Sequence, residues 1–235
     1  MFGFGKRKPV KALPPPEAVF VSETGLVRAD NQDNVLVLPE QGVFCVADGM
    51  GGGADGAKAS NVVCRELKMT MHVVEGDFAS RVAAAQNALV DANYAIYTYA
   101  DEHGFAQMGS TAAVLVLDPS DRARAAVVHV GDSRVYRVRH GLAECLTRDH
   151  RVLGSNTLTR AVGGAATVRC DVREVDVRPG DRFVICSDGV SGVVPDGRLA
   201  VFASGGALET AAARLADAVV KAGAPDNYSF VLVSV

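Results

Sequence analysis

Five aspartates lie at the edges of apolar, strand-like runs of this 235-residue chain. One ends the segment 28–33, three follow the apolar runs 43–47, 127–131 and 183–187, and one precedes the run 228–233: Asp33, Asp48, Asp132, Asp188 and Asp226. Such strand ends can meet at one edge of a sheet, where the carboxylates would offer hard oxygen ligands. A site rich in oxygen and free of sulfur suits Mg²⁺ or Mn²⁺ rather than zinc or copper. The pattern predicts a metal-dependent hydrolase that acts on a phosphorylated substrate.

The Asp-Gly pairs also have a simpler interpretation as turns. The pairs at 48–49 and 188–189 follow apolar runs, but Asp-Gly is favoured in two-residue hairpin turns as well. The pairs at 55–56 and 196–197 have no apolar run directly before them, and we expect those two to be ordinary turns. Five aspartates beside strand ends, several followed by Gly, Asn or Ser, favour a metal site over a set of unrelated turns.

Arg28 stands five residues before Asp33. A planar guanidinium beside a metal site suits the bidentate capture of a phosphate. A lone arginine is otherwise a solvated surface charge, and the sequence by itself leaves both roles open.

Composition predicts one domain, residues 18–235, after a flexible N-terminal tail, residues 1–17, that is basic and rich in proline. The tail carries four basic residues and no acid up to residue 16, so the remainder has a net charge of −7 within a total of −3, which argues against a nucleic-acid partner. No apolar run is long enough to span a bilayer, and no secretory signal is recognisable. Five cysteines without a Cys-x-x-Cys pair predict free thiols in a reducing cytoplasm.

The periodicity of apolar residues predicts an α+β fold. Strands are expected at 18–23, 34–38, 42–47, 110–117, 124–130, 134–138, 170–177, 182–186 and 228–235, and helices at 54–67, 79–100 and 207–222. The connections at 118–123 and 131–133 are too short for the crossovers that parallel strands need. We therefore expect two antiparallel β-sheets flanked by α-helices.

The glycine cluster after Asp48 suggests a competing interpretation. Residues 51–56 match the Gly-x-Gly-x-x-Gly pattern of dinucleotide-binding folds, and a strand at 67–74 would place Glu75 where such folds bind ribose. The later strands are connected too tightly for a doubly wound parallel sheet, and the other aspartates would have no role. We rank this interpretation below the hydrolase.

The ordered motifs resemble those of the metal-dependent (type 2C, PPM) serine/threonine protein phosphatases in their compact bacterial form. The matching segments are 25–33, 46–52, 108–111, 129–134, 146–150, 158–163, 187–190 and 226–227. Each motif is modest alone, but their order and spacing are specific. The resemblance implies a four-layer sandwich of two antiparallel β-sheets flanked by α-helices, with two Mg²⁺ or Mn²⁺ ions at one edge and a third, weaker ion nearby.

The resemblance also implies how the metal ions are held. Asp48 would bridge two ions, the carbonyl of Gly49 would hold one of them, and Asp33 would act mainly through bound water. Asp188 and Asp226 would bind one ion.

Two further residues receive roles from the resemblance. Asp132 would support the third ion together with Asp188. Arg28 would bind the substrate phosphate while a water between the two ions attacks phosphorus, which makes Arg28 and Asp48 the expected catalytic residues.

The chain departs from the family pattern in two places. Gly53 stands where the family commonly has a histidine that helps to protonate the leaving group, and His150 is either a substitute acid or a residue that fixes its loop. Only residues 151–158 form the flap beside the site, which is longer in many bacterial relatives, so we expect a short, open flap.

The implied function is the hydrolysis of phosphoserine and phosphothreonine in proteins that a Ser/Thr protein kinase has modified. We expect a cytoplasmic monomer without a membrane span. The alternative is a catalytically weak metal-binding regulatory module of the same fold, because Gly53 replaces the usual histidine.

Overall fold

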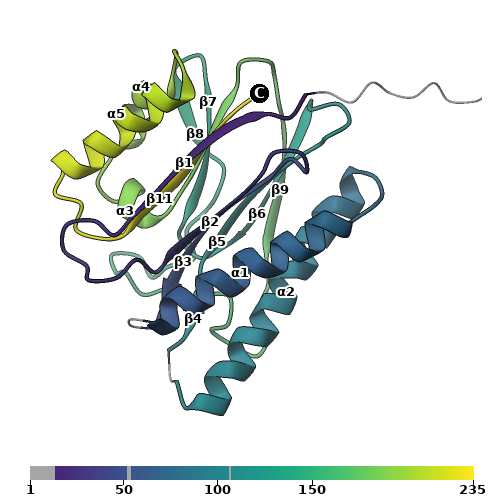
Figure 1. The fold of residues 1–235 in the computed structure, drawn as a ribbon, viewed down its shortest axis with the longest axis vertical. Helices are drawn as coiled ribbons and strands as arrows, with labels where there is room; N and C mark the ends of the chain where they lie inside the picture. The colour runs from purple at the N-terminus through teal and green to yellow at the C-terminus, as the bar shows by residue number, and fades with distance from the viewer. Residues whose placement is uncertain (1–13, 52–53, 106) are drawn as a thin grey trace, which may run out of the picture.

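The computed structural model describes residues 14–51, 54–105 and 107–235. They form two β-sheets packed face to face, with helices on both outer faces (Figure 1). The first sheet has the order β1 (Glu17–Glu23), β11 (Tyr228–Ser234), β10 (Arg182–Cys186), β7 (Arg134–Arg139), β8 (Leu142–Cys145). The second has the order β2 (Asp33–Leu38), β3 (Val43–Met50), β5 (Ala112–Leu117), β6 (Arg124–Val130), β9 (Asp171–Asp176), and the short β4 (Gly109–Ser110) pairs with β3.

Helices complete the outer layers. The long helices α1 (Ala54–Val73) and α2 (Phe78–His103) cover the second sheet, and α3 (Asp188–Ser191), α4 (Asp196–Ala203) and α5 (Leu208–Lys221) lie on the first. Every strand pair between the described elements is antiparallel. The predicted α+β sandwich is confirmed, and the doubly wound parallel sheet of the dinucleotide interpretation is wrong.

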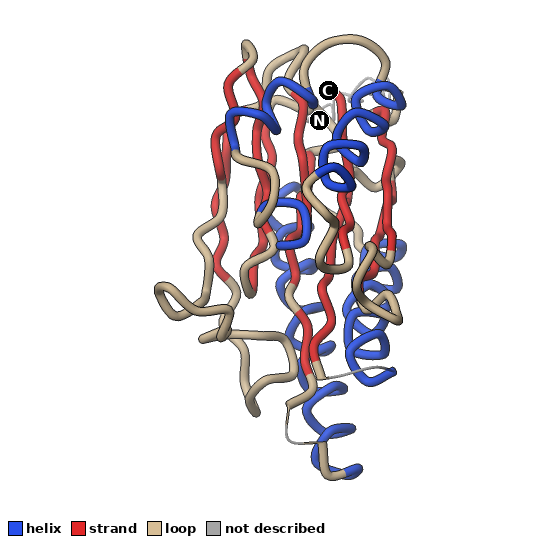
Figure 2. The backbone as a smooth tube through the Cα atoms, turned by 90° about the vertical axis from the view of Figure 1, so that its left-hand side faces the viewer, coloured by secondary structure: helices blue, strands red, loops and turns tan. Residues whose placement is uncertain are grey.

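Alternating side chains supply three apolar cores. On β11, Phe230 and Leu232 pack toward α4 and α5, whereas Val231 and Val233 fill the space between the sheets. A central strand with both faces buried has a continuous run of apolar residues, and residues 230–233 of β11 form such a run. Figure 2 shows that the strands of both sheets run in nearly the same direction, so their ends gather at the same edges of the sandwich.

Some local predictions differ from the structure. Helix α1 continues to Val73, so the strand considered at 67–74 does not exist. The Asp-Gly pairs at 55–56 and 196–197 are not turns but lie in the first turns of α1 and α4. An aspartate in a first turn complements the positive end of the helix, which gives these pairs a helical role.

Three short elements were not predicted at all. They are β8, α3 and α4, which contain four, four and eight residues. Segments of this length carry too few periods of apolar residues to be recognised, and tertiary packing stabilises them instead. The predicted tail, residues 1–17, lies largely outside the described residues.

Candidate metal and phosphate site

Strand ends from both sheets bring the predicted aspartates together. In the β2–β3 pair, Asp33 lies opposite Asp48. Asp188 follows β10, Asp226 precedes β11, and these two strands are neighbours in the other sheet. Asp132 follows β6.

One cleft collects most of these groups. It has a volume of about 290 Å³, and its lining includes six of the seven predicted site residues: Arg28, Asp48, Gly49, Asp132, Asp188 and Asp226. The seventh, Asp33, does not line the cleft but stands beside it, paired with Asp48 across the strands. The tertiary structure thus places the whole predicted set in one region.

Asp33 is a buried carboxylate with one satisfied oxygen. Its Oδ2 accepts a hydrogen bond of 2.8 Å from the hydroxyl of Ser187, while its Oδ1 is buried and has no hydrogen-bond partner among the described residues. Burial without a partner is costly for a carboxylate oxygen. An oxygen of this kind is suited to a water molecule or a cation.

Mutual repulsion and burial raise the pKa values of this cluster. Burial, together with Asp188 and Asp226, raises the pKa of Asp33 to about 6. Burial, together with Asp188 and Asp149, raises the pKa of Asp132 to about 6. The pKa of Asp48 lies well above its usual range because Asp48 is withdrawn from water and faces the other carboxylates. Crowded carboxylates of this kind are stabilised by a bound cation.

These shifts predict how pH affects the metal-free protein. The pKa of Asp33 rises from about 3.9 in the unfolded chain to about 6 in the folded one, so the folded state binds the proton more tightly. The contribution of Asp33 to stability in the presence of a chelator should therefore be larger at pH 5 than at pH 7.5 and fall as pH rises through 6. Asp33→Asn should stabilise the metal-free protein at pH 7.5 by an amount on the order of 1 kcal/mol and should weaken this pH dependence.

Thermal unfolding of chelator-treated protein at the two pH values tests this prediction. The matched control is Asp149→Asn. Burial alone would raise the pKa of Asp149, but two hydrogen bonds from Arg134, of 2.9 and 2.8 Å, lower it instead. The control should therefore destabilise the protein at pH 7.5. A metal-free Asp33→Asn variant that melts below the native protein at pH 7.5 would contradict the account.

Backbone hydrogen bonds fix Asp48 in its place. Thr111 donates its N–H to the carbonyl of Asp48 at 2.8 Å, and its hydroxyl accepts the N–H of Asp48 at 2.9 Å. The hydroxyl of Ser110 also lies 3.0 Å from that carbonyl. Sequence reasoning included residues 108–111 only as part of a motif and assigned them no role.

Asn227 joins the loop between β1 and β2 to the start of β11. Its Oδ1 accepts the N–H of Gln32 at 3.0 Å, and its Nδ2 donates to the carbonyls of Thr24 and Asp30, both at 2.8 Å. A β-carbon on Gly189 would lie 1.9 Å from the carbonyl oxygen of Asn227, so only glycine fits there. No pattern in the sequence indicated these hydrogen bonds, because the partners of Asn227 are about 200 residues away in the chain.

Arg28 reaches the cleft through an ion pair. Its Nη2 donates to Asp226 Oδ2 at 2.8 Å, its Nε lies 2.8 Å from Oδ1, and its side chain is 55% exposed. This bidentate pair uses one edge of the guanidinium, whose donors form a planar fork with five N–H groups. The structure therefore holds Arg28 at the rim of the carboxylate cluster rather than loose on the surface.

His150 fixes its loop. The ring Nδ1 accepts the N–H of Gly131 at 3.0 Å, the Nε2 lies 3.1 Å from Asp171 Oδ2, and the side chain is 8% exposed. His150 lines neither this cleft nor the larger one beside it. The simpler of its two predicted roles is confirmed. Gly53, which stands where the family commonly has a histidine, lies outside the described residues.

The flap is short, as the residue count predicts. Val152 donates its N–H to the carbonyl of Thr157 at 2.9 Å, and Arg151 forms an isolated bridge with Leu158. Leu153 at the tip is fully exposed. Arg151 also places a positive charge near the cluster, with its Nη1 3.9 Å from Asp132 Oδ2.

The donor set matches a hard divalent cation. All of the candidate ligands are carboxylate or carbonyl oxygens, which Mg²⁺ and Mn²⁺ prefer. Within the described residues, no three or more His, Cys, Asp or Glu side chains are close enough to hold a metal ion by themselves. An ion here would complete its coordination with backbone oxygen and water, which suits Mg²⁺ because that ion retains several waters.

Comparison with known proteins identifies the family. Residues 24–225 match the model of the protein phosphatase 2C family, and the chain belongs to this family. The serine/threonine protein phosphatase PstP of Mycobacterium tuberculosis is 30% identical over 234 residues, which cover 91% of this chain but 44% of PstP. The chain thus spans less than half the length of that curated relative.

Solved structures share the fold over nearly the whole chain. PppA, described as a key regulatory component of T6SS in Pseudomonas aeruginosa, has a TM-score of 0.89 at 30% identity and covers 95% of this chain and 99% of its own. The catalytic domain of PstP, in complex with two manganese ions, has a TM-score of 0.81 at 28% identity and covers 94% and 98%. The resemblance stated from the motifs is confirmed. In the described part of the chain, none of the helices has the length and hydropathy needed to cross a membrane.

Proposed function

We propose that this chain is a Mg²⁺- or Mn²⁺-dependent phosphatase that hydrolyses phosphoserine and phosphothreonine in proteins. The observation that carries the proposal is the convergence of Asp48, Asp132, Asp188 and Asp226 on one cleft, with Arg28 at its rim. Family membership supports it, as do the relatives named serine/threonine phosphatases. Those relatives weigh against the alternative of a catalytically weak regulatory module.

We assign the metal ligands as the resemblance implies. Asp48 and the carbonyl of Gly49 would hold the two ions together with Asp188 and Asp226, and Asp33 would act through water. Divalent ions at this position would activate a water and neutralise charge on the phosphate. The neighbour that contains two manganese ions supports this assignment.

Two charged residues take further roles in the proposal. Asp132, which is buried and near Arg151, would support a third, weaker ion together with Asp188. Arg28 would orient the phosphate through the guanidinium edge that its pair with Asp226 leaves available, and the pair would hold that edge toward the cleft.

The biological setting follows from the same chemistry. Substrates would be phosphoproteins produced by a Ser/Thr protein kinase, which this enzyme would oppose. We propose that the chain acts as a monomer in the cytoplasm, where its free cysteines would stay reduced. The catalytic domain would comprise residues 18–235.

Metal-dependent turnover of two substrates tests the proposal. Purified protein should hydrolyse p-nitrophenyl phosphate and a phosphothreonine peptide when Mn²⁺ is present and should lose both activities after chelation. Because p-nitrophenolate leaves readily, its release needs little help from an acid. Turnover of p-nitrophenyl phosphate with no turnover of any phosphopeptide would indicate an impaired acid step, and no metal-dependent turnover of either would refute the proposal.

A further inference from the structure

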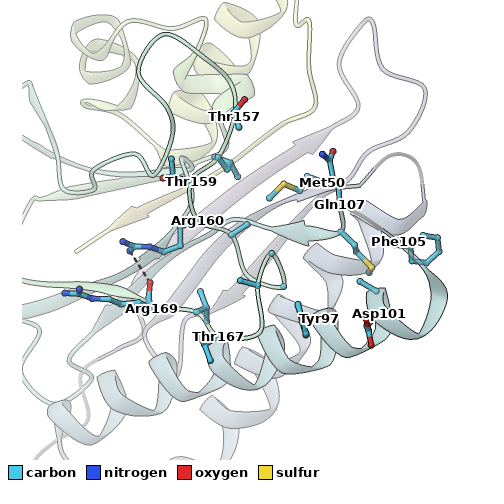
Figure 3. Close-up of a pocket in the computed structure, with 18 of the residues that line it drawn as sticks. Met50, Tyr97, Asp101, Phe105, Gln107, Thr157, Thr159, Arg160, Thr167 and Arg169 are labelled. Carbon is cyan, nitrogen blue, oxygen red and sulfur yellow. Dashed lines mark hydrogen bonds between the residues drawn. The ribbon is translucent and has the colours of Figure 1, made fainter.

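A second, larger cleft lies next to the carboxylate site. Figure 3 shows residues that line it. The cleft has a volume of about 870 Å³ and lies between the C-terminal end of α2 and the segment 156–169. Met50, Asn156 and Leu158 line both clefts, so the two are adjacent. We propose that this second cleft binds the polypeptide that flanks the phosphorylated residue, with an apolar side chain of the substrate as its anchor; this inference rests on the proposed function.

The volumes of the two clefts indicate which part of the substrate each cleft can bind. The carboxylate cleft, at about 290 Å³, is at the low end of the range for small-molecule sites and suits a phosphate with the side chain that carries it. Residues on either side of a phosphothreonine must therefore lie on the adjoining surface. The larger cleft shares lining residues with the carboxylate cleft. A peptide whose phosphorylated residue lies in the carboxylate cleft can therefore extend along the surface into the larger one.

The lining of the larger cleft mixes polar and apolar groups, and its α2 side offers two partly exposed rings to an apolar side chain of the substrate. On the α2 side, Tyr97 and Phe105 are 39% and 37% exposed, so each ring leaves apolar surface open to an incoming group. Figure 3 shows Met50 and Gln107 next to each other, between Phe105 on one side and Thr157 and Thr159 on the other, with Arg160 and Arg169 farther along the cleft. The rings can anchor one apolar side chain of a peptide, while the polar and charged lining, which includes Asp101, Arg160 and Arg169, can hydrogen-bond the rest of it.

The α2 wall is fixed before any peptide arrives. Gly104, at φ 72°, closes α2, and the N–H of Phe105 donates to the carbonyl of Ala100 at 2.9 Å. The ring of Phe105 also packs near Tyr99 and His103, with centroids 6.0 Å away in both cases. The ring therefore holds its position without a ligand.

The opposite wall is attached to the same helix. Asn93 of α2 accepts the N–H of Gly163 through Oδ1 at 2.7 Å, and its Nδ2 donates to the carbonyl of Ala165 at 3.0 Å. A β-carbon on Gly163 would lie 2.2 Å from Ile96, so this close contact requires glycine. Because one helix holds both walls, the cleft is preformed, which lowers the entropic cost of binding an extended peptide.

A matched pair of tyrosines on α2 tests the proposal. Tyr97 lines the cleft, whereas Tyr94 is 71% exposed one turn earlier and does not. The probes are phosphothreonine peptides of about ten residues in which leucine replaces alanine at each flanking position in turn. The native protein should prefer leucine at one or two positions by about fivefold or more in kcat/KM, as expected when a buried apolar anchor is gained.

Tyr97→Ala should reduce this preference to nearly one, with kinetics on p-nitrophenyl phosphate unchanged, and Tyr97→Phe should retain it. Tyr94→Ala should behave as the native protein does on both substrates. An equal leucine preference in native and Tyr97→Ala proteins, or no leucine preference at any position, would overturn the proposal. Self-association that Tyr97→Ala abolishes, without any peptide preference, would instead assign the cleft to a second copy of the chain.

Binding of the same peptides separates this inference from the proposed function. A fluorescent leucine-containing peptide should bind native protein about fivefold more tightly than Tyr97→Ala protein, whether or not it is hydrolysed. If the protein turns over phosphopeptides but Tyr97→Ala changes neither peptide binding nor kinetics, the inference of a peptide cleft is rejected and the proposed function stands. Tyr97-dependent binding without any metal-dependent turnover would reject the proposed function and leave the cleft as a peptide site.

Discussion

Asp48→Asn should abolish metal-dependent phosphatase activity, with kcat reduced by about a thousandfold or more, equivalent to about 4 kcal/mol of transition-state stabilisation. Asp48 lies in the cleft opposite Asp33 and near three other carboxylates, so its charge is the one most surrounded by candidate ligands. Asn keeps the shape but removes the negative charge that would attract two cations. Turnover of p-nitrophenyl phosphate with Mn²⁺ measures the effect.

The fold should survive this change, since the structure gives a reason for greater stability rather than less. The pKa of Asp48 is raised by its withdrawal from water and by its acidic neighbours, so a neutral side chain relieves repulsion in the metal-free protein. The matched control is Asp196→Asn, in an exposed Asp-Gly pair outside the cleft. Asparagine keeps the side-chain oxygen that accepts a hydrogen bond from the hydroxyl of Tyr136. The control should keep full activity. Turnover of Asp48→Asn within about tenfold of native would exclude the proposed metal site.

Arg28→Ala should raise KM for p-nitrophenyl phosphate by about tenfold, with a smaller change in kcat, since loss of one charged contact costs about 1.4 kcal/mol or more. A small phosphomonoester offers little else to bind, so its affinity should depend strongly on the guanidinium. Arg28→Lys should recover only part of the loss, because an ammonium group cannot form the bidentate contact with either Asp226 or a phosphate.

A measurement of Mn²⁺ affinity distinguishes substrate binding from a metal defect in this variant. Arg28→Ala frees Asp226 from its ion pair and leaves all of the proposed ligands in place, so the concentration of Mn²⁺ at half-maximal activity should not rise. Unchanged kinetics would mean that Arg28 serves only to neutralise Asp226. A large increase in the required Mn²⁺ concentration would mean that the pair positions Asp226 as a ligand.

The antiparallel sandwich and its main elements could be predicted from the pattern of apolar residues. The strands at 124–130 and 182–186 have the bounds that the sequence predicts, because each is a mostly apolar run that begins at an arginine and ends before Gly131 or Ser187. The connections between successive strands are too short for parallel crossovers, so antiparallel pairing could also be predicted. The aspartates were identifiable as a set, since five of them beside the ends of apolar runs favour a metal site over unrelated turns.

How those residues work together depends on contacts that form only in the folded chain. The pair between Arg28 and Asp226, and the hydrogen bonds of Asn227 to residues 24–32, join positions that are about 200 residues apart in the chain. Such contacts leave no periodic or local signal, because they depend on which strands become neighbours in the sheets. The peptide cleft beside the site has the same origin, since its walls come from α2 and from residues 156–169, and folding alone places Asn93 against Gly163.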